Sequence, residues 1–208
     1  MTSVPPAYPV RYSVDYPERL DRLSTALRLF YILPVLLVYL LVAGASGTTR
    51  AGDFTSFAVR GTSGIALALV LMLLFRRKYP RWWFDWLLAL SRFGARLSVY
   101  GGLLTDRYPA TDDEQSVHLD LDYPDAGQLN RWLPLVKWFL VIPHYLVLIF
   151  LVLAELFVTV FAWFAIVFTG RYPRGLFDFV VGVQRWSLRV AGYAFFMITD
   201  QYPPFSLN

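Results

Sequence analysis

The chain contains no cysteine. This absence excludes disulfides, thiolate metal ligands and thiol nucleophiles. Charged residues are also scarce, at 16% of the sequence, whereas hydrophobic residues make up 57% and aromatic residues 18%. A soluble domain carries about 25% charged residues on average. Much of this chain is therefore expected to face lipid rather than water.

Sequence motifs of well-known catalytic sites are missing as well. We find no Gly-Lys-Ser/Thr phosphate loop, no Gly-x-Ser-x-Gly elbow and no His-Glu-x-x-His metal pair. The formal net charge is +4, but the arginines lie at the edges of apolar runs and form no basic stripe on a soluble surface. This pattern favours anionic lipid head groups, and not nucleic acid, as partners. No metal or other cofactor is predicted.

One pattern occurs twice along the chain. Residues 169–179 (TGRYPRGLFDF) correspond to residues 76–86 (RRKYPRWWFDW), and each copy continues through two arginines to a Thr-Asp-x-Tyr-Pro ending. A repeated unit of about half the chain predicts two tandem repeats, at 1–109 and 110–208.

The two repeats differ in one loop. Lys137 follows Arg28 at an offset of 109 residues, but Asp178 follows Asp85 at an offset of only 93. The first repeat therefore has 16 extra residues, which fall within 44–60. This loop is either a tolerated insertion, the favoured interpretation, or a site of specific contacts.

Each repeat is expected to contain a strand, two membrane spans and an amphipathic helix. Alternating apolar and polar residues predict the strands, and apolar runs of about 20 residues predict the spans. A tight turn near Ala154–Glu155 is expected to divide the long apolar run of repeat 2. The predicted segments are strand 10–17, spans 26–45 and 57–75 and helix 82–104 in repeat 1, and strand 117–124, spans 132–153 and 155–168 and helix 175–198 in repeat 2.

The predicted fold class is thus an all-α integral membrane protein with four spans, two short cytoplasmic strands and two interfacial amphipathic helices. In this arrangement all 19 lysines and arginines except Arg50 and Arg60 lie on one side. The positive-inside rule makes that side cytoplasmic, and it holds both termini and both strands. The alternative, an inverted three-plus-three bundle, lets 82–104 and 175–198 cross as well and separates the strands. The expected location is the inner (plasma) membrane.

A line of charged residues runs along one face of each amphipathic helix. At about 100° per residue, the members of each line fall within a narrow arc. They are Arg81, Asp85, Arg92 and Arg96 in the first helix, and Arg174, Asp178, Arg185 and Arg189 in the second. Ionisable groups near lipid are costly unless they are paired or hydrated. Ion pairing is the favoured interpretation, binding of anionic lipid head groups is the alternative, and a catalytic or proton-relay role comes third.

Four residues within the apolar runs are also singled out. Pro34 and Pro143 are expected to kink equivalent helices. Each kink either only sets the shape of its helix, the favoured interpretation, or opens a backbone carbonyl toward a cavity. His144 and Glu155 differ from their counterparts in repeat 1 and are candidates for specific contacts, although a lone histidine is weak evidence for a metal site. Glu155 faces water if the turn lies there. It becomes a functional candidate if the helix continues through it.

Several motifs of the second half resemble a known family. They are 168–179 (FTGRYPRGLFDF), 185–190 (RWSLRV) and 199–205 (TDQYPPF), together with Trp138-Phe139 and Ile142-Pro143-His144-Tyr145. They resemble an uncharacterised bacterial membrane-protein family, domain of unknown function 4389, which is common in actinobacteria. The resemblance is strong across 117–208 and degenerate across 10–109. It implies a membrane location and a repeated architecture, but no activity and no site residues.

The favoured function is a non-enzymatic accessory or scaffold subunit of a larger inner-membrane complex. The chain is small, lacks catalytic motifs and is rich in aromatic residues suited to packing against other integral membrane subunits. The alternative is a lipid or small-molecule carrier that uses the cleft between the repeats, with Pro34 and Pro143 as hinges. A membrane-embedded enzyme that uses Asp85 or Asp178 is a third hypothesis.

Overall fold

The computed structural model describes residues 8–43, 69–111, 113 and 115–208. Most of the predicted span 57–75 and the loop 44–60 with its extra residues lie outside these described residues. The elements in chain order are β1 (Val10–Val14), α1 (Arg22–Ala26), α2 (Arg28–Val42), a helical stretch at 69–76, α4 (Arg81–Gly101), β2 (Val117–Leu121), α5 (Leu133–Leu140), α6 (Ile142–Thr169) and α7 (Arg174–Ala194).

The two strands form a small antiparallel sheet. Tyr12 of β1 lies opposite Leu119 of β2. Both side chains are buried, whereas their neighbours Arg11 and His118 are exposed. The alternation seen in the sequence therefore corresponds to one buried and one solvated face. The observed strands lie within the predicted segments 10–17 and 117–124 but end three residues earlier, at Val14 and Leu121.

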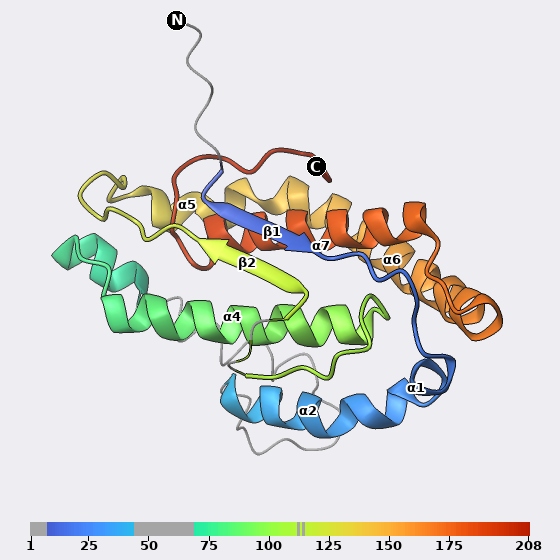
Figure 1. Cartoon of the computed structure of the whole chain (residues 1–208). Coiled ribbons are helices and arrows are strands. Elements are labelled where there is room, and N and C mark those ends of the chain that lie inside the picture. Colours follow the sequence, from blue (N-terminus) through green and yellow to red (C-terminus); the bar gives the residue numbers. More distant parts are fainter. Residues whose placement is uncertain (1–7, 44–68, 112, 114) are drawn as a thin grey trace, which may run out of the picture.

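The molecule has three layers (Figure 1). The sheet lies on α4 and α7, which form the middle layer, and α2 and α6 lie on the far side of α4 and α7 respectively. Each strand packs on the helix of the other half of the chain, because β2 contacts α4 and β1 contacts α7. The short helix α1 contacts α6, and α5 contacts α7.

Close packing joins β1 to α7. Gly192 has no side chain, and a Cβ atom there would come within 2.7 Å of Cγ2 of Val10. The glycine thus lets the strand approach the helix backbone. Val180 and Val183 of α7 and Val99 of α4 are completely buried in this middle layer.

Proline and glycine residues set several helix ends. Helices α4 and α7 begin directly after Pro80 and Pro173, both of which are extended. Gly170 ends α6 in the left-handed conformation with a φ of 73°, a helix end that favours glycine. The predicted helices at 82–104 and 175–198 thus begin within one residue of the observed starts.

The predicted four-span fold is wrong. The run 132–168 does not form a hairpin of spans at 132–153 and 155–168, because it folds into α5 followed by the single 28-residue helix α6. Helix α6 passes straight through Ala154 and Glu155, since both are good helix formers and no glycine or proline lies near them. Of the described helices, α6 alone is long and apolar enough to cross a membrane, while α2 is apolar but shorter.

The prediction that α4 and α7 lie in a membrane interface is also wrong. Both helices occupy the middle layer, where α4 packs between β2 and α2, and α7 between β1 and α6. Their amphipathic pattern is real, but protein covers both of their sides. An apolar helix face has to be shielded from water, and the pattern does not specify whether lipid or another helix shields it.

Pro34 and Pro143 differ in their positions. Pro34 lies inside α2. Pro143, however, lies in the first turn of α6, where a missing backbone N–H is tolerated. It separates α6 from α5 at Val141, so the prediction that Pro143 kinks the interior of a span is wrong.

Candidate functional site

Opposite sides of the molecule differ in chemistry. The solvated face of the sheet carries exposed charges that pair with one another or with α4. The ion pairs are Arg11–Asp122 and Arg92–Asp120, and the His118 ring lies 3.2 Å from the Asp15 carboxyl group. The far side, formed by α2, α5 and α6, is apolar.

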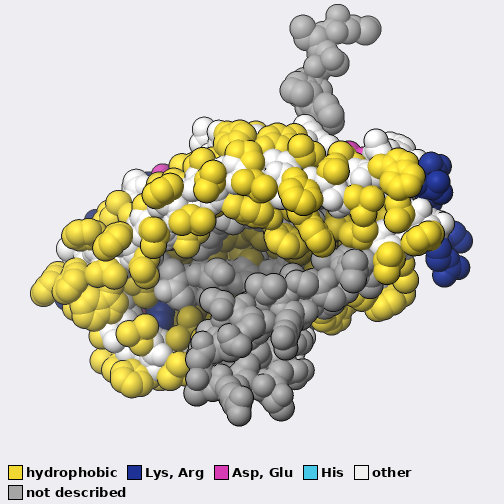
Figure 2. Space-filling model, turned by 180° about the vertical axis from the view of Figure 1, so that it is seen from behind, with side chains coloured by type: hydrophobic (Ala, Val, Ile, Leu, Met, Phe, Trp, Pro, Cys, Tyr) yellow, Lys and Arg dark blue, Asp and Glu magenta, His cyan; other side chains and the backbone are white. Residues whose placement is uncertain are grey.

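The apolar face, as we call it, consists of the exposed hydrophobic side chains of α2, α5 and α6. Among its members are Phe30, Leu37, Phe139, Phe150, Phe161 and Phe168. Phe150 and Phe168 are 72% and 74% exposed, so the protein itself does not cover them. Figure 2 shows hydrophobic side chains over most of the coloured surface seen from behind. Monomeric soluble proteins rarely expose contiguous apolar patches of more than a few hundred Å².

A cleft of about 780 Å³ lies between α2 and α4 on one side and α6 and α7 on the other. Figure 2 shows the surface hollowed in its centre. Hydrophobic side chains make up most of its wall, including Leu36, Leu97, Val152, Leu156 and Leu188. The cleft also exposes a small polar group of residues that comes from α6 and α7.

Glu155 is the centre of this polar group. Its Oε1 accepts a hydrogen bond of 3.1 Å from the Gln184 amide of α7. The amide oxygen of Gln184 accepts a bond of 2.6 Å from the hydroxyl of Tyr12, below the sheet. Burial raises the pKa of the Glu155 carboxyl group, and the bond from Gln184 opposes this rise. Glu155 thus lies on the cleft wall because α6 continues through the predicted turn.

The two arginines at the centre of the charged lines bind the outer edges of the sheet. Nε of Arg92 donates to the carbonyl of Leu119 at 2.9 Å, and Nε of Arg185 donates to the carbonyl of Tyr12 at 3.0 Å. Since Tyr12 and Leu119 lie opposite each other, an arginine caps each edge at the same level. Free strand edges invite pairing with other chains, and these arginines occupy them.

The remaining charged-line residues have different surroundings. Arg96 and Arg189 donate to the carbonyls of Ala110 and Asn208 at 2.8 and 2.5 Å. The Arg81 and Arg174 guanidinium groups lie over the rings of Tyr123 and Tyr16, at 5.0 and 4.8 Å. Within the described part of the chain, Asp85 and Asp178 form no ion pair. The structure therefore places these arginines mainly on backbone carbonyls and tyrosine rings.

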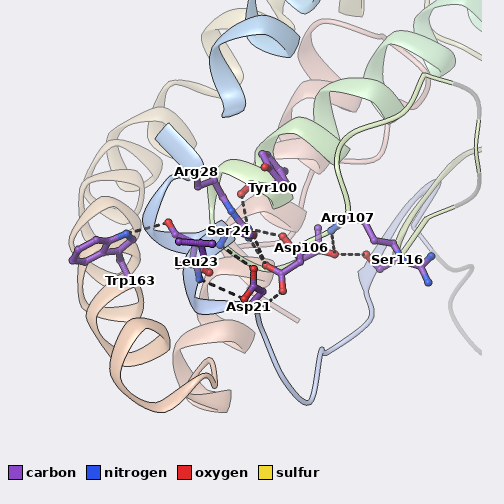
Figure 3. A network of polar contacts seen from close by, with 11 residues as sticks. Asp21, Leu23, Ser24, Arg28, Tyr100, Asp106, Arg107, Ser116 and Trp163 are labelled. Atoms are coloured by element: carbon purple, nitrogen blue, oxygen red, sulfur yellow. Dashed lines mark hydrogen bonds and ion pairs between the residues drawn. The ribbon is translucent and has the colours of Figure 1, made fainter. Parts of the chain in front are cut away.

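Arg28, at the start of α2, is a buried cation that sequence reasoning did not single out. It is 3% exposed. Its guanidinium group donates to the carbonyls of Thr105 and Tyr100 at 2.5 and 3.2 Å and pairs with Asp106. The group also lies 4.5 Å from the centre of the Tyr100 ring. Figure 3 shows how this network joins α2 to the segment after α4.

Lys137 of α5 occupies a matching site. Its ammonium group is fully buried, donates to the carbonyl of Thr199 at 2.6 Å and pairs with Asp200 at 2.8 Å. It lies 4.8 Å from the centre of the Tyr193 ring. Burial lowers the pKa of Lys137, while Asp200 raises it. Each apolar run is therefore tied through a buried cation to a Thr-Asp pair near the end of its half.

His144 lies in the first turn of α6 and is completely buried. Its Nδ1 accepts a hydrogen bond of 2.9 Å from the Trp186 indole, and its ring stacks on Phe205 at 3.9 Å. Its Nε2 has no partner, and burial lowers its pKa. The residues that the structure describes contain no group of three or more His, Asp or Glu that could hold a metal ion.

Comparison with known proteins identifies the second half of the chain. Residues 132–206 match the family described as Domain of unknown function (DUF4389). This segment belongs to the DUF4389 family. The DUF4389 segment includes α5, α6, α7 and Tyr202 and Phe205 of the C-terminal segment, so it contains Lys137, His144 and Glu155. No curated protein and no solved structure matches the chain.

The family predicted from the sequence is thus confirmed for residues 132–206, while the buried cations and Gln184 were missed. A signal for the cations was present: Arg28 and Lys137 occupy corresponding places, and so do Asp106 and Asp200. Gln184 gave no such signal, because its role depends on the contact between α6 and α7.

Proposed function

We propose that this protein is a non-enzymatic accessory protein of the inner membrane that lies within one leaflet. The apolar face of α2, α5 and α6 contacts the acyl chains, and the charged sheet faces water. The observation that carries this proposal is the separation of the two chemistries onto opposite sides of a three-layered fold. Burial of apolar surface contributes about 25 cal/mol per Å², so covering such a face with lipid is strongly favourable.

An orientation with α6 in the membrane plane follows from its neighbour. Helix α7 packs along α6 and carries β1 on its other side. If α6 stood upright, α7 would enter the hydrocarbon together with Arg185, Arg189 and the charged sheet. Charged groups and open strand edges are costly there. In the plane of the leaflet, all of these groups remain on the aqueous side.

Cationic side chains at the ends of the helices support contact with anionic head groups. Arg76, Arg77 and Lys78 are exposed at the end of the helical stretch 69–76, and Arg131 and Arg171 are exposed at the ends of the α5–α6 unit. Basic residues near a membrane surface contribute about 1 kcal/mol each with anionic lipids. The negative surface potential of the cytoplasmic leaflet supports a cytoplasmic location for the sheet and for the C-terminal segment beside it.

The division of the chain into halves at 1–109 and 110–208 also stays a proposal. It is supported by equivalent contacts in the two halves, namely the two buried cations on their Thr-Asp pairs and the two arginines on the sheet edges. The cation contacts lie within each half, and the arginine contacts join each half to the strand of the other.

The membrane orientation is tested with single-cysteine variants, since the chain has no cysteine of its own. Spin labels at positions 146, 150, 157, 161 and 168 report depth in vesicles that contain anionic lipid. We expect similar, shallow depths along α6, because these positions share one helix face. A label at Ser13 on the sheet should remain in water. A gradient of depth from one head-group region to the other would contradict the in-plane arrangement.

The accessory role is tested by identifying the proteins that assemble with this protein. Blue-native electrophoresis of the tagged protein in mild detergent should show a larger assembly that contains other integral membrane subunits. A variant with Phe150→Ser and Phe161→Ser serves as a control. It changes the apolar face alone, because both side chains are exposed on α6 and the sheet should stay intact. Migration of the wild-type protein solely as a free species would contradict the accessory role.

A second candidate function is that of a carrier of a lipid or another apolar small molecule, and the cleft favours it. Its volume of about 780 Å³ lies within the range of about 300–1,000 Å³ found for ligand pockets. It combines apolar walls with a few polar groups, as such pockets do. Native mass spectrometry of the wild-type protein should detect a retained lipid. Loss of the lipid from a variant with a larger side chain in the cleft would support the carrier function.

A further inference from the structure

We propose that the cleft binds one amphiphile whose head group is a hydrogen-bond donor, a hydroxyl or an ammonium group, that contacts Glu155. This inference rests on the carrier function proposed above and specifies the ligand. The tail lies against the apolar walls that α2 and α6 contribute, and the head group reaches the polar group formed by Glu155 and Gln184.

The hydrogen bonds already made in the cleft determine what the head group must supply. Gln184 uses its amide N–H on Glu155 and its oxygen on Tyr12. The hydroxyl groups of Thr159 and Ser187 donate to the backbone of their own helices. Oε2 of Glu155 has no hydrogen bond to any described residue. Among the polar groups that α6 and α7 present to the cleft, the acceptor that remains is therefore a carboxylate oxygen of Glu155.

The charges of the described lining residues disfavour an anionic head group. The described residues that line it include no Lys, Arg or His, and Glu155 is their sole carboxylic acid. The nearby Arg185 donates to the carbonyls of Tyr12 and Leu207. A phosphate would face the Glu155 carboxylate with no cation among the described lining residues. A hydroxyl or an ammonium group would instead donate a hydrogen bond to that carboxylate.

The partly buried position of Glu155 adds to this argument. A carboxylate taken out of water without a counter-charge is unstable, which is the reason for its raised pKa. A bound donor would restore the hydrogen bond that water otherwise provides. A bound donor head group would thus give Glu155 a second hydrogen bond beside the one from Gln184.

The test compares probes with one tail and different head groups. The full-length protein in detergent is loaded with a pyrene-labelled long-chain alcohol, and hexadecanol, hexadecylamine and hexadecyl phosphate compete for it. We expect the alcohol and the amine to displace the label at concentrations at least about tenfold below that of the phosphate, a preference of about 1.4 kcal/mol. Glu155→Gln, which keeps the shape but not the charge, should abolish the preference for the amine over the phosphate.

Two variants separate binding from selectivity. Ser98→Trp fills the cleft from α4 and should remove saturable binding of every probe, while Ser13→Trp on the sheet should not change it. Equal displacement by the phosphate, or unchanged selectivity in Glu155→Gln, would overturn the inference and leave the carrier function standing. If no probe binds saturably to the wild-type protein, both are overturned.

Discussion

Lys137 and Asp200 form an ion pair of 2.8 Å in which the lysine side chain is fully buried. They are 63 residues apart and join the last turn of α5 to the segment that follows α7. Removing one partner of a buried pair leaves an uncompensated group and is strongly destabilising. This contact, and not the exposed pairs of the sheet, is expected to hold the C-terminal segment in place.

Lys137→Met should therefore destabilise the protein by about 3–5 kcal/mol, measured as the free energy of unfolding in detergent. The methionine keeps most of the volume but leaves the Thr199 carbonyl and Asp200 without their cation. The chain contains one other lysine, Lys78, which is exposed. Lys78→Met should change the stability by less than about 0.5 kcal/mol, and equal losses in both variants would contradict the assigned role.

Stability should fall when the pH is lowered through about 6.5, the pKa of an unperturbed histidine. Burial lowers the pKa of His144 in the folded state, so below pH 6.5 the unfolded chain binds a proton that the folded chain does not. Protonation favours the unfolded state in this window. It would also remove the acceptor that Nδ1 offers to Trp186.

His144→Gln should make the free energy of unfolding less dependent on pH between 5 and 7, measured by chemical denaturation at several pH values. Ser13→Gln provides the control, because Ser13 is exposed on the sheet and does not titrate, so this variant should leave the slope as it is in the wild type. An identical slope in the His144 variant would assign the acid sensitivity to another group.

Two glycines near the α6–α7 junction should respond in opposite directions to alanine. Gly170 has a φ of 73°, so Gly170→Ala should cost about 1–2 kcal/mol. Gly175 lies in the first turn of α7, where a Cβ meets nothing within 4 Å. Gly175→Ala should stabilise the helix by about 0.5–1 kcal/mol. Thermal unfolding followed by circular dichroism distinguishes the two, and a stabilising Gly170→Ala would show that α6 ends differently.

Loss of an arginine cap should free one edge of the sheet. Arg185→Met removes the donors to the carbonyls of Tyr12 and Leu207, which should speed amide hydrogen exchange in β1. An uncapped edge also favours pairing with other chains, detected as a larger species by light scattering. Arg171→Met is the control, since that side chain is exposed. Equal exchange in both variants would show that the cap contributes nothing.

The periodic parts of the chain were predictable because their signals are local. Alternation at period two gave the strands around Tyr12 and Leu119, and Pro80 and Pro173 marked the starts of α4 and α7. The residues of DUF4389 were recognisable for the same reason, as short runs in sequence order.

The turn at Ala154–Glu155 was wrong because length was the only argument for it. A run too long for one span does not have to turn, and nothing at this point stops a helix. The placement of α4 and α7 was wrong because an amphipathic pattern specifies which side of a helix is shielded from water but not whether lipid or protein shields it. Protein fills both sides here, with β2 and α2 around α4, and β1 and α6 around α7.

The sequence by itself determined the strands, the middle helices, the family of residues 132–206 and the shortage of polar surface. Those properties follow from backbone geometry and composition, which act over a few residues or over the whole chain. The tertiary structure alone decided that each strand packs on the helix of the other half, that Lys137 meets Asp200, and that Glu155 faces a cleft. Such contacts join residues far apart in the chain, and their energies depend on burial that exists only after the layers have packed.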